Sequence, residues 1–242
     1  MTTAKILGII PARGGSKGVS RKNIRLLAGK PLIAYTMDAA KKSRLLTRLV
    51  VSTDDLEISQ IAHSLDCQVI ERPAELAQDT TPMLSVIQHT LRFLDEREHY
   101  LPDITVILQP TAPLRTSKHI DEALTRLDNP ELDSVVSVSL VPGHYSPHWQ
   151  FIIQDGVLRL FTDQPFGQII TRRQDLPATY TRNGAIYAFK TALLMEHKTI
   201  YGNYCHAYIM SSEDSINIDS EQDFWLAERL VIQRTEVIHA SY

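Results

Sequence analysis

A glycine-rich loop near the N-terminus gathers positive charge. Residues 11–23 read PARGGSKGVSRKN, and no acidic residue precedes Asp38. Glycine lets backbone N–H groups approach phosphate oxygens closely, and cationic side chains neutralise those oxygens. Over the whole chain, Asp and Glu (28) outnumber Lys and Arg (25), so this local excess predicts a triphosphate site rather than an ordinary surface loop. The cationic side chains are Arg13, Lys17, Arg21 and Lys22.

Two well-known phosphate-binding patterns do not describe this loop. A P-loop reads G-x-x-x-x-G-K-S/T, and the dinucleotide fingerprint reads G-x-G-x-x-G. Neither pattern fits residues 11–23. The sequence therefore gives no motif for a P-loop kinase or for a nicotinamide-dependent dehydrogenase.

Strands and helices alternate around the loop and would have to position it. Short apolar runs predict buried strands, and helical spacing of apolar residues predicts the helices between them. Such alternation is typical of an α/β fold with a mostly parallel central sheet covered on both faces. The predicted strands are 5–10, 49–52, 67–70, 104–108 and 134–140, with returning strands at 185–189 and 206–210. The predicted helices are 32–40, 56–65, 84–94, 120–127 and 220–233, the last with Ser220 as its N-cap.

One segment breaks this alternation. Pro and Gly recur through residues 141–182 among aromatic and polar side chains, which is typical of irregular structure. We predict that 141–182 forms an inserted lobe or flap, and that 1–140 and 183–242 together form the α/β domain.

The composition limits the classes of function. A chain of 242 residues with 43% hydrophobic and 22% charged content is long enough for one main domain with a large core. The net charge of −3 argues against nucleic acid and anionic membranes as partners. Two distant cysteines suggest neither disulfides nor a zinc site. The apolar run 6–10 is too short for a signal core or a membrane span, so we expect a cytoplasmic protein.

Nine short motifs, in order along the chain, resemble those of the CMP-sialic acid synthetases (acylneuraminate cytidylyltransferases). They are IPARGGSKG (10–18), RKN (21–23), GKPL (29–32), STDD (52–55), ERPAELA (71–77), LQPTAPLR (108–115), RQDLP (173–177), NGAIY (183–187) and SINID (215–219). The resemblance implies a Rossmann-like nucleotidyltransferase with a dimerisation lobe that reaches over the partner's active site. It implies transfer of CMP from CTP to a nine-carbon 2-keto sugar acid, with release of pyrophosphate.

The resemblance also implies roles for single residues. On the nucleotide side it assigns Arg13, Ser16, Lys17, Lys22, Asn23 and Arg72, with Lys22 nearest the reacting phosphorus. On the sugar side it assigns Gln109, Arg173, Asn183 and Tyr187. The planar guanidinium of Arg173 matches the carboxylate of the sugar acid, and Gln109 offers both a donor and an acceptor at a strand end. Arg13, Lys22 and Asp219 are the expected catalytic residues.

The expected cofactor is Mg²⁺, with Mn²⁺ as the alternative ion. The family pattern reads Asp-Ile-Asp where this chain has Asn217-Ile-Asp219, so one carboxylate is replaced by an amide. We expect Asp219 to be the main ligand and Asn217 a weaker or water-mediated one. Asp214, Glu213 and Glu221 are nearby alternatives that would restore the lost charge.

Two further departures concern the substrate. Thr81-Pro-Met83 replaces small hydroxyl residues expected near the cytidine, and residues 144–149 (HYSPHW) lack an expected lysine. The second difference favours a bacterial relative of sialic acid such as legionaminic acid. Pseudaminic acid and Kdo are alternative substrates, and a nucleotide-binding protein without turnover is the alternative of another class.

Overall fold

The computed structural model describes residues 4–16 and 18–240, and the predicted phosphate ligand Lys17 lies outside these ranges. A seven-stranded sheet with the order β11-β7-β10-β6-β1-β4-β5 forms its centre. Only β10 runs antiparallel to its neighbours β6 and β7, and the other paired strands are parallel. The strands are β1 (Ile6–Pro11), β4 (Arg48–Thr53), β5 (Gln68–Glu71), β6 (Ile104–Ile107), β7 (Ser134–Leu140), β10 (Tyr180–Lys190) and β11 (Cys205–Ile209).

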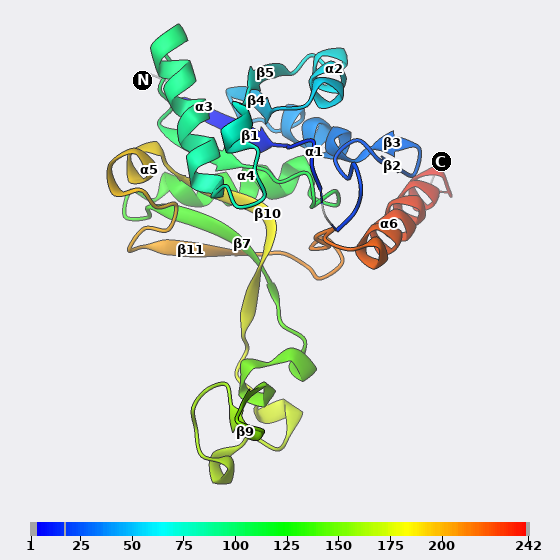
Figure 1. The fold of residues 1–242 in the computed structure, drawn as a ribbon, viewed down its shortest axis with the longest axis vertical. Coiled ribbons are helices and arrows are strands. Elements are labelled where there is room, and N and C mark those ends of the chain that lie inside the picture. Colours follow the sequence, from blue (N-terminus) through cyan, green and yellow to red (C-terminus); the bar gives the residue numbers. More distant parts are fainter. Residues whose placement is uncertain (1–3, 17, 241–242) are drawn as a thin grey trace.

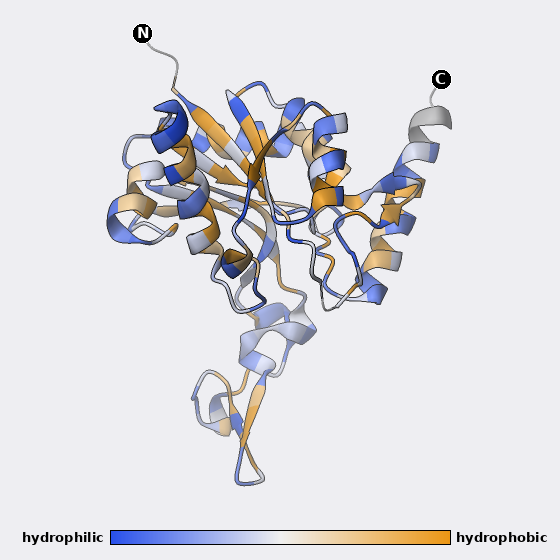
Figure 2. Ribbon diagram, turned by 45° about the horizontal axis from the view of Figure 1, so that its top comes forward, coloured by the Kyte–Doolittle hydropathy of each residue, from blue (hydrophilic) through white to orange (hydrophobic). Residues whose placement is uncertain are grey.

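Helices cover both faces of the sheet (Figure 1). One core cluster contains buried side chains of α1, α2 and α4, and a second contains those of α3 and α5. A third cluster packs α6 against the segment around Val19, Leu27 and Leu32. In Figure 2 the central strands are largely apolar, while the helices mix both kinds of residue. The helices are α1 (Leu32–Lys41), α2 (Leu56–Ser64), α3 (Met83–Glu98), α4 (Ser117–Thr125), α5 (Thr191–His197) and α6 (Glu221–Ala240).

The α/β fold with a mostly parallel sheet is confirmed, as are the predicted strands and helices, although β10 begins before the predicted 185 and α6 continues beyond the predicted 233. The helical run predicted at 120–127 is α4 followed by a 3₁₀ turn, Arg126–Asp128. The sequence analysis did not predict α5 or the small hairpin of β2 (Leu26–Leu27) and β3 (Lys30–Pro31). Among the described residues, no helix combines the length and the hydrophobicity needed to cross a bilayer.

An arm projects from the end of β7 and returns through β10 (Figure 1). Leu140 pairs with Tyr180 where the two strands leave the body. The arm carries a hairpin of β8 (Phe151–Gln154) and β9 (Val157–Leu160). Its two-residue turn, Asp155-Gly156, has φ of 51° and 79°, the positive values that tight hairpin turns require. Strand β10 begins at Tyr180, inside the predicted lobe 141–182, and the domain division itself stays a prediction.

Candidate active site

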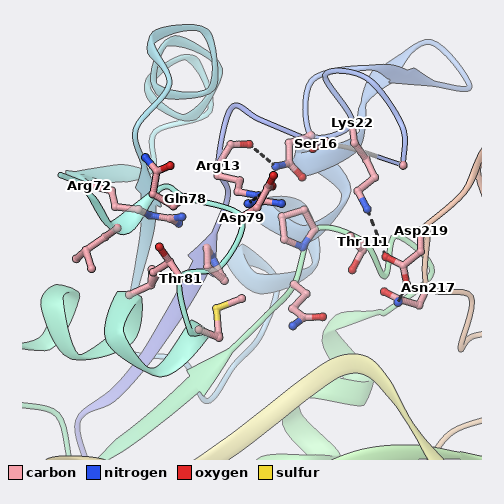
Figure 3. A pocket seen from close by; sticks show the side chains of 18 residues that line it. Arg13, Ser16, Lys22, Arg72, Gln78, Asp79, Thr81, Thr111, Asn217 and Asp219 are labelled. Carbon is pink, nitrogen blue, oxygen red and sulfur yellow. Dashed lines mark hydrogen bonds and ion pairs between the residues drawn. The ribbon is translucent and has the colours of Figure 1, made fainter. Parts of the chain in front are cut away.

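An open cavity of about 390 Å³ lies at the carboxyl ends of the central strands (Figure 3). Open α/β sheets bind ligands at this edge because the loops that leave parallel strands meet there. Five segments supply its wall: the loop after β1, the loop after β5, the first turn of α3, the loop after β6 and the segment before α6. Predicted residues that line it are Arg13, Ser16, Lys22, Asn23, Arg72, Gln109, Asn217 and Asp219.

Three cationic side chains enter this cavity, two from the loop after β1 and one from the loop after β5. Arg13 pairs with Asp79 at 2.7 Å (Nη1 to Oδ1). Lys22 donates to the carbonyl of Ile218 at 2.5 Å, and its Nζ lies 3.5 Å from Asp219 Oδ1. Arg72 is buried, which lowers its pKa to about 10, so the guanidinium is still protonated at neutral pH. Asp79 and Asp219 offset part of this charge, and the cations still outnumber the carboxylates among the described lining residues, which favours an anionic ligand.

Close packing explains two of the three glycines in the loop after β1. A Cβ on Gly18 would lie 2.0 Å from the carbonyl oxygen of Asp219, and one on Gly14 would lie 2.4 Å from Asp55 Oδ2. Only glycine allows the loop to approach the segment before α6 so closely. Asn23 is buried and donates to the carbonyl of Arg13 at 2.9 Å, so it holds the loop together.

A second cavity, of about 490 Å³, adjoins the first. Tyr187 lines it, and burial raises the pKa of the tyrosine hydroxyl. Arg182 also lines it and donates to Tyr201 Oη at 3.4 Å. The two cavities share Met83, Gln109, Asn217 and Asp219.

Two predicted sugar ligands lie elsewhere. Asn183 is buried, and its Oδ1 accepts from Ser137 Oγ at 2.6 Å while its Nδ2 donates to Ser215 Oγ at 2.9 Å. These bonds tie β10 to β7 and to the segment before α6, so Asn183 supports the site through the backbone that carries it. Arg173 lies in the arm beside Gly143 and lines neither cavity.

The acidic end of the cavity centres on Asp219, which is 72% exposed. Asn217 Nδ2 donates to Asp219 Oδ2 at 2.7 Å, and Asn217 Oδ1 is buried without a hydrogen-bond partner. Of the alternative acids, Asp214 pairs with Arg234 and Glu221 pairs with Arg25. Within the described ranges, no three His, Cys, Asp or Glu side chains cluster as a metal site.

Two arginines belong to the site although the sequence analysis gave them no role. Arg115 is completely buried, and its Nη1 donates to the carbonyls of Gln109 (3.1 Å) and Ala185 (2.8 Å). Burial lowers the pKa of Arg115 to about 9. This guanidinium joins the end of β6 to β10 beside the shared wall of the two cavities. The sequence signal for Arg115 was its place at the end of the LQPTAPLR motif. Arg182 had no signal beyond its position next to Asn183.

Comparison with known sequences gives relatives along nearly the whole chain. The family described as Cytidylyltransferase matches residues 7–233. Post-translational flagellin modification protein B of Campylobacter coli is 34% identical and covers 96% of this chain and 97% of its own. CMP-N,N′-diacetyllegionaminic acid synthase of Legionella pneumophila is 34% identical, with coverages of 97% and 99%. N-acylneuraminate cytidylyltransferase of Escherichia coli is 34% identical over 92% of this chain, which spans 51% of that longer protein.

Solved structures share the fold. A CMP:2-keto-3-deoxy-manno-octonic acid synthetase complexed with CTP superimposes with a TM-score of 0.71 at 16% identity, covering 96% of this chain and 100% of that one. A 4-diphosphocytidyl-2C-methyl-D-erythritol synthase of Anaerococcus prevotii gives 0.62 at 13% identity, covering 95% and 96%. These likenesses support the Rossmann-like arrangement. The sequence match over residues 7–233 also identifies the family. The chain belongs to the cytidylyltransferase family.

Proposed function

We propose that this chain transfers the cytidylyl group of CTP to the anomeric hydroxyl of a nine-carbon 2-keto sugar acid. The observation that carries this proposal is the pair of adjoining cavities with a shared wall. One cavity holds three cations suited to a triphosphate. The other presents a tyrosine, an arginine and an amide suited to a polar acid. Two substrates can therefore meet at Gln109, Asn217 and Asp219.

The reaction needs alignment more than covalent chemistry from the protein. The oxygen of the anomeric hydroxyl forms a bond to the α-phosphorus of CTP, and the bond from that phosphorus to the bridging oxygen breaks. Pyrophosphate leaves with the bonding electron pair, and the hydroxyl proton passes to solvent. Arg13 and Lys22 would neutralise the phosphate charge, and holding both anions in line lowers the barrier. Arg72, Ser16 and Asn23 would hold the nucleotide, together with Lys17.

Mg²⁺ is the ion that this site suits. Mg²⁺ prefers hard oxygen ligands and commonly takes one or two carboxylates, with phosphate oxygens and water completing its shell. Asp219 is an exposed carboxylate at the cavity edge, next to the cation of Lys22. It would hold Mg²⁺, or Mn²⁺ in its place, together with the triphosphate. The bound ion would withdraw charge from the phosphate oxygens.

On the sugar side, Gln109 and Tyr187 would contact the acid from within the chain. Arg173 would come from the arm of a partner subunit and bind the carboxylate, because in its own subunit it lines neither cavity. Asn183 would act by holding the strand that carries Tyr187. The proposed assembly is a homodimer in which each arm completes the other subunit's sugar site.

The proposed acid is of the legionaminic type. Relatives of similar length include proteins named CMP-N,N′-diacetyllegionaminic acid synthase, and these match more than nine-tenths of both chains. A cytoplasmic location accords with two free cysteines, of which Cys205 is exposed.

The deciding experiment measures pyrophosphate release from CTP and Mg²⁺ with N,N′-diacetyllegionaminic, N-acetylneuraminic, pseudaminic and Kdo acids. We expect release with one nine-carbon acid and a loss of at least about 100-fold in Asp219→Ala. The matched control is Asp95→Ala, which removes an exposed carboxylate from α3. CTP binding without release for any acid would overturn the proposal and favour a nucleotide-binding protein.

A further inference from the structure

Asn217 carries a buried carbonyl oxygen without a partner among the described residues. Its amide nitrogen donates to Asp219 Oδ2 at 2.7 Å, but its Oδ1 accepts no hydrogen bond. Native structures rarely leave a buried acceptor unpaired, because burial removes the water that would otherwise satisfy it. The unpaired oxygen points to a donor that arrives with the substrate.

The neighbouring carboxylate decides which way the amide faces. With Oδ1 turned towards Asp219, two oxygens that carry only lone pairs would face each other, so Nδ2 takes that side. Two ligands of one ion must both direct oxygen towards it. Because Asn217 directs an N–H group towards Asp219, the arrangement does not fit Asn217 as a second ligand of an ion held by that carboxylate.

Gln109 and Gly184 lie on the other side of the amide. A Cβ on Gly184 would be 3.1 Å from Asn217 Oδ1 and 2.8 Å from Gln109 Oε1, so both oxygens border the same small space. Gly184 also has φ of 74°, in the region that favours glycine. The missing Cβ lets both oxygens pack this closely against Gly184, because a side chain here would displace Gln109 Oε1. Asn217 and Gln109 line both cavities, so the space lies where the two substrates would meet.

We infer that Asn217 Oδ1 and Gln109 Oε1 form an acceptor pair that binds a hydroxyl or amide N–H donor of the sugar acid. Asn217 Nδ2 meanwhile fixes the Asp219 carboxylate. The inference rests on the proposed function and makes Asn217 a specificity-determining residue. An aspartate here would place a second negative charge beside Asp219, in front of a substrate that is itself an anion. The amide supplies the acceptor without that charge.

The test compares Asn217→Ala with Asp219→Ala, using N,N′-diacetyllegionaminic and N-acetylneuraminic acids as probes. Mn²⁺ binding in the presence of CTP is followed by electron paramagnetic resonance, and KM is measured for each substrate. We expect Asn217→Ala to raise KM for the sugar acid about tenfold, as loss of one hydrogen bond predicts. KM for CTP and the Mn²⁺ affinity should stay within about threefold, whereas Asp219→Ala should lose Mn²⁺ binding.

A second variant, Asn217→Asp, keeps the side-chain shape. It should tighten Mn²⁺ binding through the second carboxylate and raise KM for the sugar acid through its charge. Loss of Mn²⁺ binding in Asn217→Ala with an unchanged sugar KM would make Asn217 a metal ligand and overturn the inference. If the native chain is active and Asn217→Ala has the same KM for the sugar acid, the inference is overturned and the proposed function is not. Absence of release by the native chain would overturn the proposed function and the inference with it.

Discussion

Arg13 enters the nucleotide cavity already paired with a carboxylate. Its partner Asp79 lines the same cavity, and both side chains are about one-third exposed. An ion pair at this exposure is screened by water and contributes little to stability. A triphosphate that carries several charges can therefore replace Asp79 as the partner of Arg13. The ion pair with Asp79 holds the long side chain of Arg13 in the nucleotide cavity.

Gly18 is the residue at which the loop after β1 and the segment before α6 come closest. A Cβ there would lie 2.0 Å from the carbonyl oxygen of Asp219, and backbone must move to admit it. We expect Gly18→Ala to destabilise the fold by about 1–3 kcal/mol and to weaken CTP binding by at least about tenfold. Thermal unfolding and calorimetric titration with CTP measure the two effects.

Gly15 provides the matched control in the same loop. A Cβ at this position meets no atom within 4 Å, so Gly15→Ala should leave the stability and the CTP affinity nearly unchanged. If both alanine variants behave alike, close packing is not the reason for glycine at position 18.

At the scale of elements, the sheet was predictable where its strands are buried on both faces. β1 reads as a nearly continuous apolar run, as strands of parallel sheets do, and β4 and β7 carry shorter Val-rich runs with small hydroxyl residues. The antiparallel direction of β10 was not predictable, because it depends on the path of the arm between β7 and β10. The hairpin in the arm was missed although Asp155-Gly156 between two apolar runs is a hairpin signal, because the sequence analysis read the whole segment as irregular.

The site was predictable to the extent that it lies at strand ends. Arg13, Arg72 and Gln109 follow β1, β5 and β6, and parallel strands bring such residues to one edge. Asn183 was predicted as a sugar ligand, but its amide is hydrogen-bonded to Ser137 and Ser215, which favours a supporting role that the sequence could not show. The role of Arg115 could not be predicted from the sequence, because only the fold shows which carbonyl groups it joins.

His119 makes the stability of α4 depend on pH. Burial lowers the pKa of His119 from its usual 6.5, although the nearby Asp214 carboxylate acts in the opposite direction. In the fold, His119 Nδ1 accepts from the backbone N–H of Thr116 at the start of α4, so the neutral ring is the one that fits. The unfolded chain then binds more protons, and stability must fall as the pH drops below 6.5 towards the pKa of the folded state.

We therefore expect a lower free energy of unfolding at pH 5.5 than at pH 7.5, and a smaller difference in His119→Gln. Urea denaturation at the two pH values measures the free energy of unfolding. Exposed carboxylates are still ionised at pH 5.5, so they do not add to the difference. His63→Gln, at an exposed position on α2, is the control. An unchanged difference in His119→Gln would assign the pH dependence to other groups.

At the scale of the whole molecule, the arm exposes apolar side chains far from the core. Ile153 is 73% exposed, and Val157 and Phe161 are each 59% exposed. Several large apolar side chains exposed on one small hairpin are typical of a protein interface. The same arm carries Arg173, whereas the residues that line the nucleotide cavity all come from the body.

Ile153→Asp should therefore weaken the proposed dimer and the turnover of the sugar acid while CTP binding persists. Analytical ultracentrifugation and CTP titration measure these effects.

Mixing two inactive variants tests whether the arm works in its own subunit or in the partner. In a dimer of Arg173→Ala with Gln109→Ala, one sugar site receives Arg173 from one subunit and Gln109 from the other, and the second site lacks both. Random exchange makes half of the dimers mixed, so the mixture should recover about a quarter of the native turnover. The control mixes each variant with more of itself and should recover nothing. If the two variants together stay inactive after subunit exchange, Arg173 acts within its own subunit, and the arm must then move towards the second cavity, because here Arg173 lines neither cavity.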